Sequence, residues 1–234
     1  RWGGYYEYDM NQAHTVDTQL NVFADFSPKI PESYKDSKFV FLANIHPVLQ
    51  LNVLEQLGDA EFVMLDTMNY WINTTKDELK KVISRVNLML LNDAEARQLC
   101  DTPNLVDAAN KVLSMGPEYV IIKKGEHGAL LFTKSGQTFA SPAYPLENLK
   151  DPTGAGDTFA GGFIGYLASC KQVTFENMKK AVIVGSALAS YTAEDFSLDK
   201  LKTVTCQDLC QRYGAFEQLT CFGALNLKEA VLAV

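Results

Sequence analysis

Apolar residues follow two different patterns along the chain, and the change lies near residue 27. From Tyr5 to about Phe26, aromatic and aliphatic residues alternate with polar ones, and no helical period is visible. Such alternation is typical of strands that have one face toward solvent or a ligand. We therefore expect a small β element at the start of the chain.

Beyond this element, short apolar runs alternate with amphipathic stretches. The runs that predict buried strands are 39–42, 62–65, 88–91 and 119–122. The stretches that predict helices are 47–57, 76–86, 93–100 and 105–115. Short apolar strands separated by helices indicate a parallel sheet that is covered on both faces. Ligands bind such sheets beyond the carboxyl ends of the strands.

The remaining part is expected to hold a hairpin and then a helical layer. Residues 129–132 and 137–140 alternate like hairpin strands and follow a Gly-rich turn. Helical patterns cover 159–167, 177–191, 198–213 and 228–233. A chain of 234 residues without an internal repeat or linker fits one sizeable α/β domain.

Composition and charge restrict the class of protein and of partner. The chain is 47% hydrophobic, carries a net charge of −7 and has no apolar run long enough to span a membrane. Its basic pairs are scattered, so we expect no nucleic-acid partner, and any nucleotide must be held by backbone amides and a metal. The five cysteines lack a C-x-x-C pair and are expected to be free, mostly buried thiols. We expect a cytoplasmic protein with no membrane partner.

Residues 151–162, with the sequence DPTGAGDTFAGG, carry the strongest chemical signal. Two glycines around an alanine let the backbone close on an oxyanion, and the helix that follows directs its free N–H groups to the same place. Asp157 at this helix start could accept the proton of an alcohol while the amides stabilise a transferred phosphoryl group. A bare G-x-G-D is more often an ordinary helix start, in which the dipole favours the aspartate.

The longer string D-x-T-G-A-G-D-x-F-x-x-G resembles the signature of the ribokinase family, the PfkB-type carbohydrate kinases. The resemblance implies a ribokinase-like, Rossmann-type three-layer α/β sandwich with a mostly parallel sheet and a small β lid. Residues 1–26 would form part of the lid, and 27–234 the nucleotide-binding and catalytic domain. The resemblance also implies an ATP-dependent kinase that uses Mg²⁺ and acts on a sugar or, as the next choice, a nucleoside.

The same resemblance assigns roles to the residues of the signature. Asp157 would be the catalytic base and would contact the acceptor hydroxyl. Gly154, Ala155 and Gly156 would supply the amides of the anion hole, and Thr153 would lie beside the nucleotide phosphates.

Two further segments resemble family motifs. Asn92 and Glu95 form an N-x-x-E pattern that would help to place magnesium through water, with Asn92 also near the nucleotide; alone, this spacing is a common helix cap. Residues 123–128, KKGEHG, resemble the nucleotide motif T-x-G-x-x-G. Gly125 and Gly128 keep its glycine frame. Lys123 replaces the threonine often found there and could pair with phosphates or point to solvent.

The acceptor site is the least determined part. Three lid residues could reach sugar hydroxyls but are equally natural in turns: Asp9, Asn11 and Asp17. Three others follow a buried strand and would lie at the ligand-bearing edge of the sheet: Asp66, Thr67 and Asn69.

Family members normally open with a βα unit that binds the acceptor, and no such pattern precedes the lid. We therefore expect that the N-terminal βα unit is missing or lies elsewhere, which leaves the sheet with an unpaired edge and exposed apolar surface unless a partner chain fills the gap. A catalytically idle relative, kept as an interaction or structural subunit, is the alternative. Retention of Asp157 argues against this idle relative. A kinase for a vitamin-like hydroxymethyl compound is a third hypothesis.

The lid sequence also carries a cluster of three aromatic residues. The rings of Tyr5, Tyr6 and Tyr8 could support a homodimer through the lid or simply cover the site.

Overall fold

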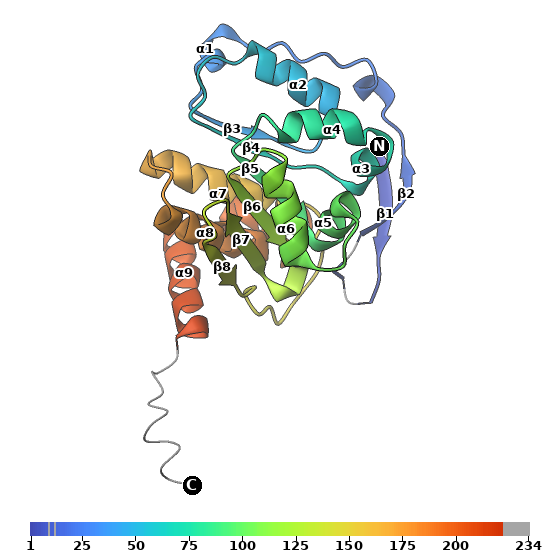
Figure 1. Cartoon of the computed structure of the whole chain (residues 1–234). Coiled ribbons are helices and arrows are strands. Elements are labelled where there is room, and N and C mark those ends of the chain that lie inside the picture. The colour runs from blue at the N-terminus through green and yellow to red at the C-terminus, as the bar shows by residue number, and fades with distance from the viewer. Residues whose placement is uncertain (9, 12, 222–234) are drawn as a thin grey trace, which may run out of the picture.

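A mixed six-stranded sheet forms the centre of the molecule (Figure 1). The computed structural model describes residues 1–8, 10, 11 and 13–221. The sheet has the order β3-β4-β5-β6-β7-β8. Its strands are β3 (Phe39–Leu42), β4 (Phe62–Leu65), β5 (Leu88–Asn92), β6 (Tyr119–Lys123), β7 (Ala129–Thr133) and β8 (Thr138–Ser141). Strands β3 to β6 are parallel, and β7 and β8 add antiparallel neighbours. The expected mostly parallel α/β sheet is confirmed.

Helices cover both faces of this sheet. The first group is α2 (Pro47–Gln56), α3 (Asn69–Thr74), α4 (Lys76–Ile83), α5 (Asp93–Cys100) and α6 (Leu105–Ser114). The second is α7 (Ala155–Cys170) and α8 (Phe175–Ala193), and α9 (Cys206–Thr220) packs on α8. Shorter helices are α1 (Glu32–Lys35), η1 (Asn21–Phe23), η2 (Gly125–His127) and η3 (Leu201–Thr203). Figure 1 shows the two groups on opposite sides of the strands.

The alternation of strand side chains explains why two separate cores form. In β5, Met89 and Leu91 belong to the core under α4, α5 and α6, whereas Leu88 and Leu90 belong to the core under α7 and α8. Successive side chains of a strand point to opposite faces, so an unbroken apolar run fills both. This is the reason that the central strands read as continuous hydrophobic segments.

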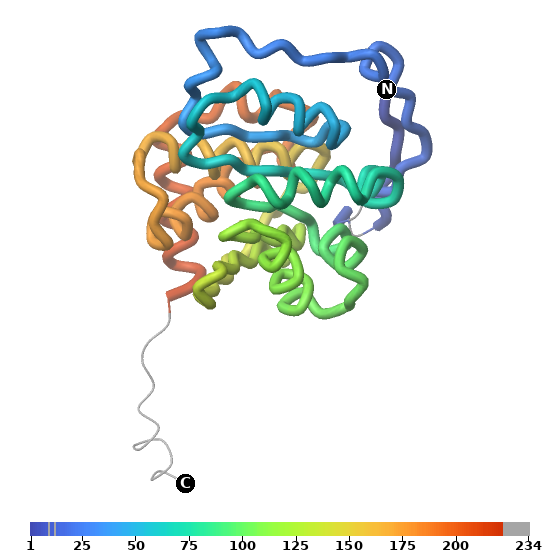
Figure 2. The backbone as a smooth tube through the Cα atoms, turned by 45° about the horizontal axis from the view of Figure 1, so that its top comes forward, coloured from blue at the N-terminus to red at the C-terminus, as the bar shows by residue number. Residues whose placement is uncertain are grey.

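A separate two-stranded sheet, the lid, lies beside one end of the central sheet (Figures 1 and 2). It consists of β1 (Trp2–Tyr6) and β2 (Ala13–Thr18), which are antiparallel. In Figure 2 the segment between the lid and β3 crosses the molecule from the lid end to the opposite end. The expected β element is therefore present, and a long connection joins it to the larger domain.

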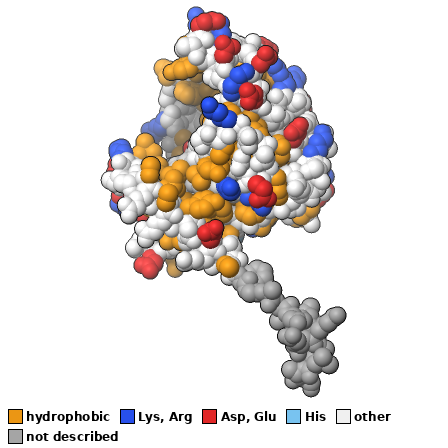
Figure 3. Space-filling model, turned by 90° about the vertical axis from the view of Figure 1, so that its left-hand side faces the viewer, with side chains coloured by type: hydrophobic (Ala, Val, Ile, Leu, Met, Phe, Trp, Pro, Cys, Tyr) orange, Lys and Arg blue, Asp and Glu red, His pale blue; other side chains and the backbone are white. Residues whose placement is uncertain are grey.

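Strand β3 is at the edge of the central sheet and pairs only with β4 within the described part of the chain. An apolar groove of about 310 Å³ lies next to it, lined partly by Phe23, Pro28 and Phe41. Exposed apolar side chains also occur elsewhere, and on the face shown in Figure 3 they gather across the middle of the surface. The unpaired edge and the exposed apolar surface were both expected.

Several boundaries differ from the prediction. The stretch 198–213 is not one helix, because η3 ends before an extended Val204 and Thr205 then caps α9 through a reciprocal hydrogen-bond pair with Asp208. Helix α3 was not predicted, since its six residues are too few for a periodic pattern. The helix expected at 228–233 lies outside the described residues.

Most of the cysteines are not buried. All five cysteines are free, but only Cys100 is buried, so the expectation of mostly buried thiols was wrong. Cys206 and Cys210 are both exposed and belong to α9, the last described helix. None of the described helices combines the length and the apolar character needed to cross a membrane.

We expect Leu90→Ala to lower the free energy of unfolding by about 2–5 kcal/mol, because it opens a cavity in a central strand whose side chain has no exposed area. Urea denaturation measures the change. Leu198→Ala is the matched control, since Leu198 is exposed, and its effect should be within about 0.5 kcal/mol. Equal losses in the two variants would contradict the assigned core.

Candidate active site

The loop before α7 has the glycine conformation and the helix start on which the expected anion hole depends. Gly154 adopts φ +84°, a left-handed conformation that favours glycine, and the helix begins at the next residue. The Ala155 N–H donates to the carbonyl oxygen of Pro152 at 3.0 Å. Among the described residues, no acceptor engages the amides of Gly156 and Asp157. Two helix-start amides therefore remain able to bind a ligand.

Close packing between α7 and α8 fixes the position of this helix start. A Cβ atom at Gly185 of α8 would lie 2.6 Å from the carbonyl oxygen of Phe159 in α7. The hydroxyl of Thr192 donates to that of Thr158 at 2.9 Å, one residue after Asp157. Asp157 is the third residue of α7 and is exposed. The two helices thus hold its carboxylate at the mouth of the loop.

An ion pair lies against the same loop. Lys123 ends β6, and its Nζ lies 3.1 Å from Oδ2 of Asp66, which follows β4. The side chains are only 18% and 7% exposed. A Cβ atom at Gly156 would lie 3.0 Å from Lys123 Nζ, so the ammonium is next to the start of α7. Of the two expectations for Lys123, a phosphate contact fits this position and a solvent-facing side chain does not.

The charges around Lys123 act on one another through a poorly solvated region. Burial alone would lower the pKa of Lys123, but the nearby carboxylates of Asp66 and Glu95, with a smaller effect from Asp157, raise it above its ordinary value. Lys123 therefore stays positively charged. Burial, and then the neighbouring Asp66, raise the pKa of Glu95 to about 7.

Asn92 and Glu95 form a complete capping box at the start of α5. The Glu95 N–H donates to Oδ1 of Asn92 at 2.7 Å, and the Asn92 N–H donates to Oε2 of Glu95 at 2.8 Å. The N-x-x-E pattern therefore caps the start of α5, as this spacing commonly does. The Oε1 atom of Glu95 makes no hydrogen bond to any described residue, and Glu95 lines the large cavity described below.

The loop after β6 keeps the glycine conformations that the motif requires. Gly125 and Gly128 have φ +54° and +82°. A Cβ atom at Gly128 would lie 1.9 Å from the carbonyl oxygen of Ser141, so no larger residue fits there. The turn between β6 and β7 is thus tightly constrained beside Lys123.

Two lid residues contact the loops of the central domain. The hydroxyls of Tyr6 and Thr153 are hydrogen-bonded at 3.1 Å. Asn11 donates through Nδ2 to Glu126 Oε1 at 2.8 Å, and its Oδ1 accepts the Glu126 N–H at 3.1 Å. The lid therefore touches both the loop at 153–157 and the loop at 123–128.

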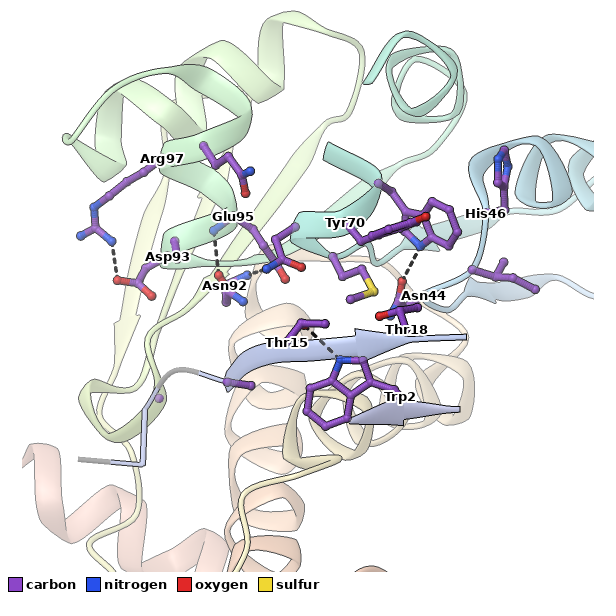
Figure 4. A pocket seen from close by; sticks show the side chains of 18 of the residues that line it. Trp2, Thr15, Thr18, Asn44, His46, Tyr70, Asn92, Asp93, Glu95 and Arg97 are labelled. Carbon is purple, nitrogen blue, oxygen red and sulfur yellow. Dashed lines mark hydrogen bonds and ion pairs between the residues drawn. The ribbon is translucent and has the colours of Figure 1, made fainter. Parts of the chain in front are cut away.

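A cavity of about 1550 Å³ lies between the lid and the loops that follow β3, β4, β5 and β6. Figure 4 shows Trp2, Asn44, Tyr70, Asn92 and Glu95 around this space. Asn11, Gly125 and Asn69 also line it. Asp157 and its loop do not. They are connected to it through the contact of Tyr6, which lines the cavity, with Thr153.

The remaining candidates are placed as follows. Asp9 lies outside the described residues. Asp17 is exposed and accepts a hydrogen bond from Gln19. The hydroxyl of Thr67 is buried without a hydrogen-bond partner among the described residues. The Asp66–Lys123 pair and the Tyr6–Thr153 contact were not predicted. The only signal for the pair was that both residues directly follow buried strands.

The residues present fit a magnesium ion that is held mainly by phosphates and water. No group of three or more His, Cys, Asp or Glu residues in the described part of the chain could form a metal site by itself. Mg²⁺ typically uses one or two carboxylates together with substrate phosphates and water. The unengaged Oε1 of Glu95 could serve such an ion, directly or through water.

Residues 11–202 match the pfkB family of carbohydrate kinases. The chain belongs to this family. It is 33% identical over 163 residues to cytidine kinase of Thermococcus kodakarensis, a match that covers 65% of this chain and 58% of that protein. It is 24% identical over 199 residues to adenosine kinase of Saccharomyces cerevisiae, a match that covers 76% of this chain and 57% of that protein. The chain thus spans less than two thirds of the length of these relatives.

Solved structures share the fold. A nucleoside kinase from Methanocaldococcus jannaschii, an archaeal member of the ribokinase family, superposes with a TM-score of 0.67 at 20% identity, covering 91% of this chain and 67% of that one. Aminoimidazole riboside kinase from Salmonella enterica, complexed with aminoimidazole riboside and an ATP analogue, superposes with a TM-score of 0.63 at 22% identity. This match covers 76% of this chain and 63% of that one. The ribokinase-like fold expected from the signature is confirmed.

In this pfkB family chain, Glu95→Gln should weaken the pH dependence of stability. The pKa of Glu95 is about 7 in the folded state against an ordinary 4.5, so the folded state holds this proton more tightly than the unfolded state. Wild-type stability should therefore fall as the pH rises from about 4.5 through 7, by up to ~3 kcal/mol. The amide oxygen of the variant can still accept the cap hydrogen bond from Asn92.

Urea denaturation at about pH 5 and about pH 8 tests this, because the difference between the two pH values isolates the titrating groups. Glu55→Gln is the control, since Glu55 is exposed, and it should keep the wild-type pH dependence. An unchanged dependence in Glu95→Gln would show that this carboxyl titrates normally.

Proposed function

We propose that this chain carries the nucleotide-binding and catalytic part of an ATP-dependent kinase that phosphorylates a hydroxyl of a sugar or a nucleoside. The observation that carries the proposal is the arrangement at the start of α7. There an exposed Asp157 follows a loop with two unengaged amides, and the ammonium of Lys123 lies against that loop. Membership of the pfkB family supports the same reaction class.

In the proposed reaction, Asp157 accepts the proton of the acceptor hydroxyl. The acceptor oxygen forms a bond to the γ-phosphorus of ATP while the bond from that phosphorus to the ADP oxygen breaks. The amides of Gly154, Gly156 and Asp157 can stabilise the charge that develops on the phosphoryl oxygens. For Ala155 to join them, its hydrogen bond to Pro152 must open, so we assign it the smallest part.

The nucleotide is proposed to lie along the loops that meet at this point. Gly125 and Gly128 shape one loop, Thr153 belongs to the other, and Lys123 lies where β6 ends. Asn92 and Glu95 would hold Mg²⁺ through water. When bound, this ion neutralises phosphate charge.

The acceptor is proposed to bind in the cavity under the lid, with its reacting hydroxyl extending beyond the cavity lining, past the Tyr6–Thr153 contact, to Asp157. Its lining combines aromatic rings, among them Trp2 and Tyr70, with the side-chain amides of Asn44 and Asn69. Such a mixture suits a ring that has hydrogen-bonding edges. Nucleosides therefore belong in any substrate screen, as the names of the relatives also suggest. For Asn11 to contact the acceptor, it would have to exchange its hydrogen bonds with Glu126.

The outer face of the lid could also bind a second copy of the chain. Tyr5 and Tyr8 are exposed there, and aromatic rings are common at interfaces. We propose a homodimer through this face, which sedimentation of the full-length gene product would detect.

Asp157→Asn should lower kcat by about 10²–10⁴-fold, because the base is lost while the shape of the side chain is kept. ATP binding should stay near the wild-type value, since the loop amides and Lys123 are unchanged. The measurement is ATP consumption by the full-length gene product with Mg²⁺ and a panel of sugars, sugar phosphates and nucleosides, with ATP affinity determined by calorimetry.

Asp59→Asn serves as the control, because Asp59 is an exposed residue outside the site. Wild-type turnover in Asp157→Asn would remove Asp157 from the role of base. A folded wild-type protein that is silent across the whole panel would instead favour the catalytically idle subunit.

A further inference from the structure

The ion pair between Lys123 and Asp66 joins two strand ends that are not neighbours in the sheet. Lys123 ends β6 and Asp66 follows β4, with β5 between them. The aspartate is itself fixed, because its Oδ1 accepts the N–H of Thr67 at 2.8 Å while its Oδ2 faces Lys123 Nζ at 3.1 Å. Both oxygens of this carboxylate are therefore engaged in holding one geometry.

Stability alone is a weak reason for such a pair. Moving two charges out of water is unfavourable, and replacing buried pairs by apolar residues is often neutral or stabilising. A threonine, which the family motif often has at position 123, would need no buried partner. A gain in stability therefore does not explain why a buried lysine stands at position 123.

The position of the ammonium provides another reason. A Cβ atom at Gly156 would lie 3.0 Å from this Nζ, so any larger residue at 156 would force the ammonium to shift by a few tenths of an ångström. Gly156 carries one of the two unengaged amides of the loop. The ammonium of Lys123 and the backbone of Gly156 are therefore direct neighbours.

We infer that Asp66 is a positioning residue that holds the Lys123 ammonium against Gly156, where Lys123 stabilises the phosphoryl group during transfer. This inference rests on the proposed kinase function. A lysine side chain has a flexible four-carbon stem, and a charge contributes most to catalysis when it needs no reorganisation at the moment of reaction. Asp66 removes that freedom without touching the reacting atoms.

The test uses three variants of the full-length gene product, with the acceptor that the screen identifies. Lys123→Met removes the charge, Asp66→Asn removes the restraint, and the double variant removes both, so that no buried charge is left unpaired. We expect Lys123→Met to lower kcat by about 10²-fold, with a smaller change in the KM for ATP. Asp66→Asn should lower kcat while Lys123 is still present.

The double variant separates positioning from a purely structural pair. If Asp66 acts through Lys123, the double variant has the kcat of Lys123→Met alone, since the two effects are not additive. If the pair only stabilises the fold, the double variant folds and regains the wild-type kcat, which would overturn the inference. Independent, additive losses would also overturn it, because Asp66 would then act without Lys123.

Lys134→Met is the matched control for the loss of one positive charge, because Lys134 is exposed on the turn between β7 and β8. It should keep the wild-type kcat. Thermal unfolding of every variant identifies losses that come from instability. If the wild-type protein turns over no acceptor, the proposed function fails; if it turns over and Lys123→Met is equally fast, only the inference fails.

Discussion

Burial of the parallel strands on both faces is the constraint on which the rest of the structure depends. The apolar side chains of β4, β5 and β6 fill two cores, so these strands have no place for a polar group along their length. Polar and charged residues can appear only where the strands end. Asp66, Asn92 and Lys123 all stand at the carboxyl ends of neighbouring strands. Because helices cover both faces of the sheet, the polar residues of the candidate site gather at the strand ends.

The second core determines where the proposed base lies. Helix α7 packs on the sheet through Phe159 and Phe163 and approaches α8 closely at Gly185. This packing leaves the first turn of α7 at the strand ends, with Gly156 beside Lys123 and Asp157 near enough to help raise the pKa of Lys123. The helix start contributes positive partial charge to a place that already holds an ammonium. Both features favour an anion there, and a phosphoryl group fits that description.

The lid supplies contacts rather than charge. It reaches the loop before α7 through Tyr6 and the loop after β6 through Asn11. The lid and these loops line a large cavity whose wall combines aromatic rings, amides and charged side chains. The lid therefore joins the proposed nucleotide loops to the proposed acceptor site, which explains why its residues lie near both.

The sequence by itself determined the elements and the local geometry of the site. Apolar runs identified the four parallel strands of the central sheet, and alternation after a Gly-rich turn identified the two antiparallel ones. The G-A-G-D string placed a glycine directly before a helix that carries Asp157. The N-x-x-E spacing indicated the cap between Asn92 and Glu95. These features depend on neighbours within a few residues, whose interactions the backbone geometry fixes.

Only the tertiary structure decided which distant residues meet. Lys123 and Asp66 are 57 positions apart, and Tyr6 and Thr153 are 147 positions apart. Their contacts depend on strand order and on the approach of the lid, which no local pattern encodes. The same holds for Gly156, since only the fold brings the ammonium at the end of β6 to within 3.0 Å of the position that a Cβ atom would take there. Local periodicity specifies the strands and helices, whereas the packing of covered layers decides which of their ends come together.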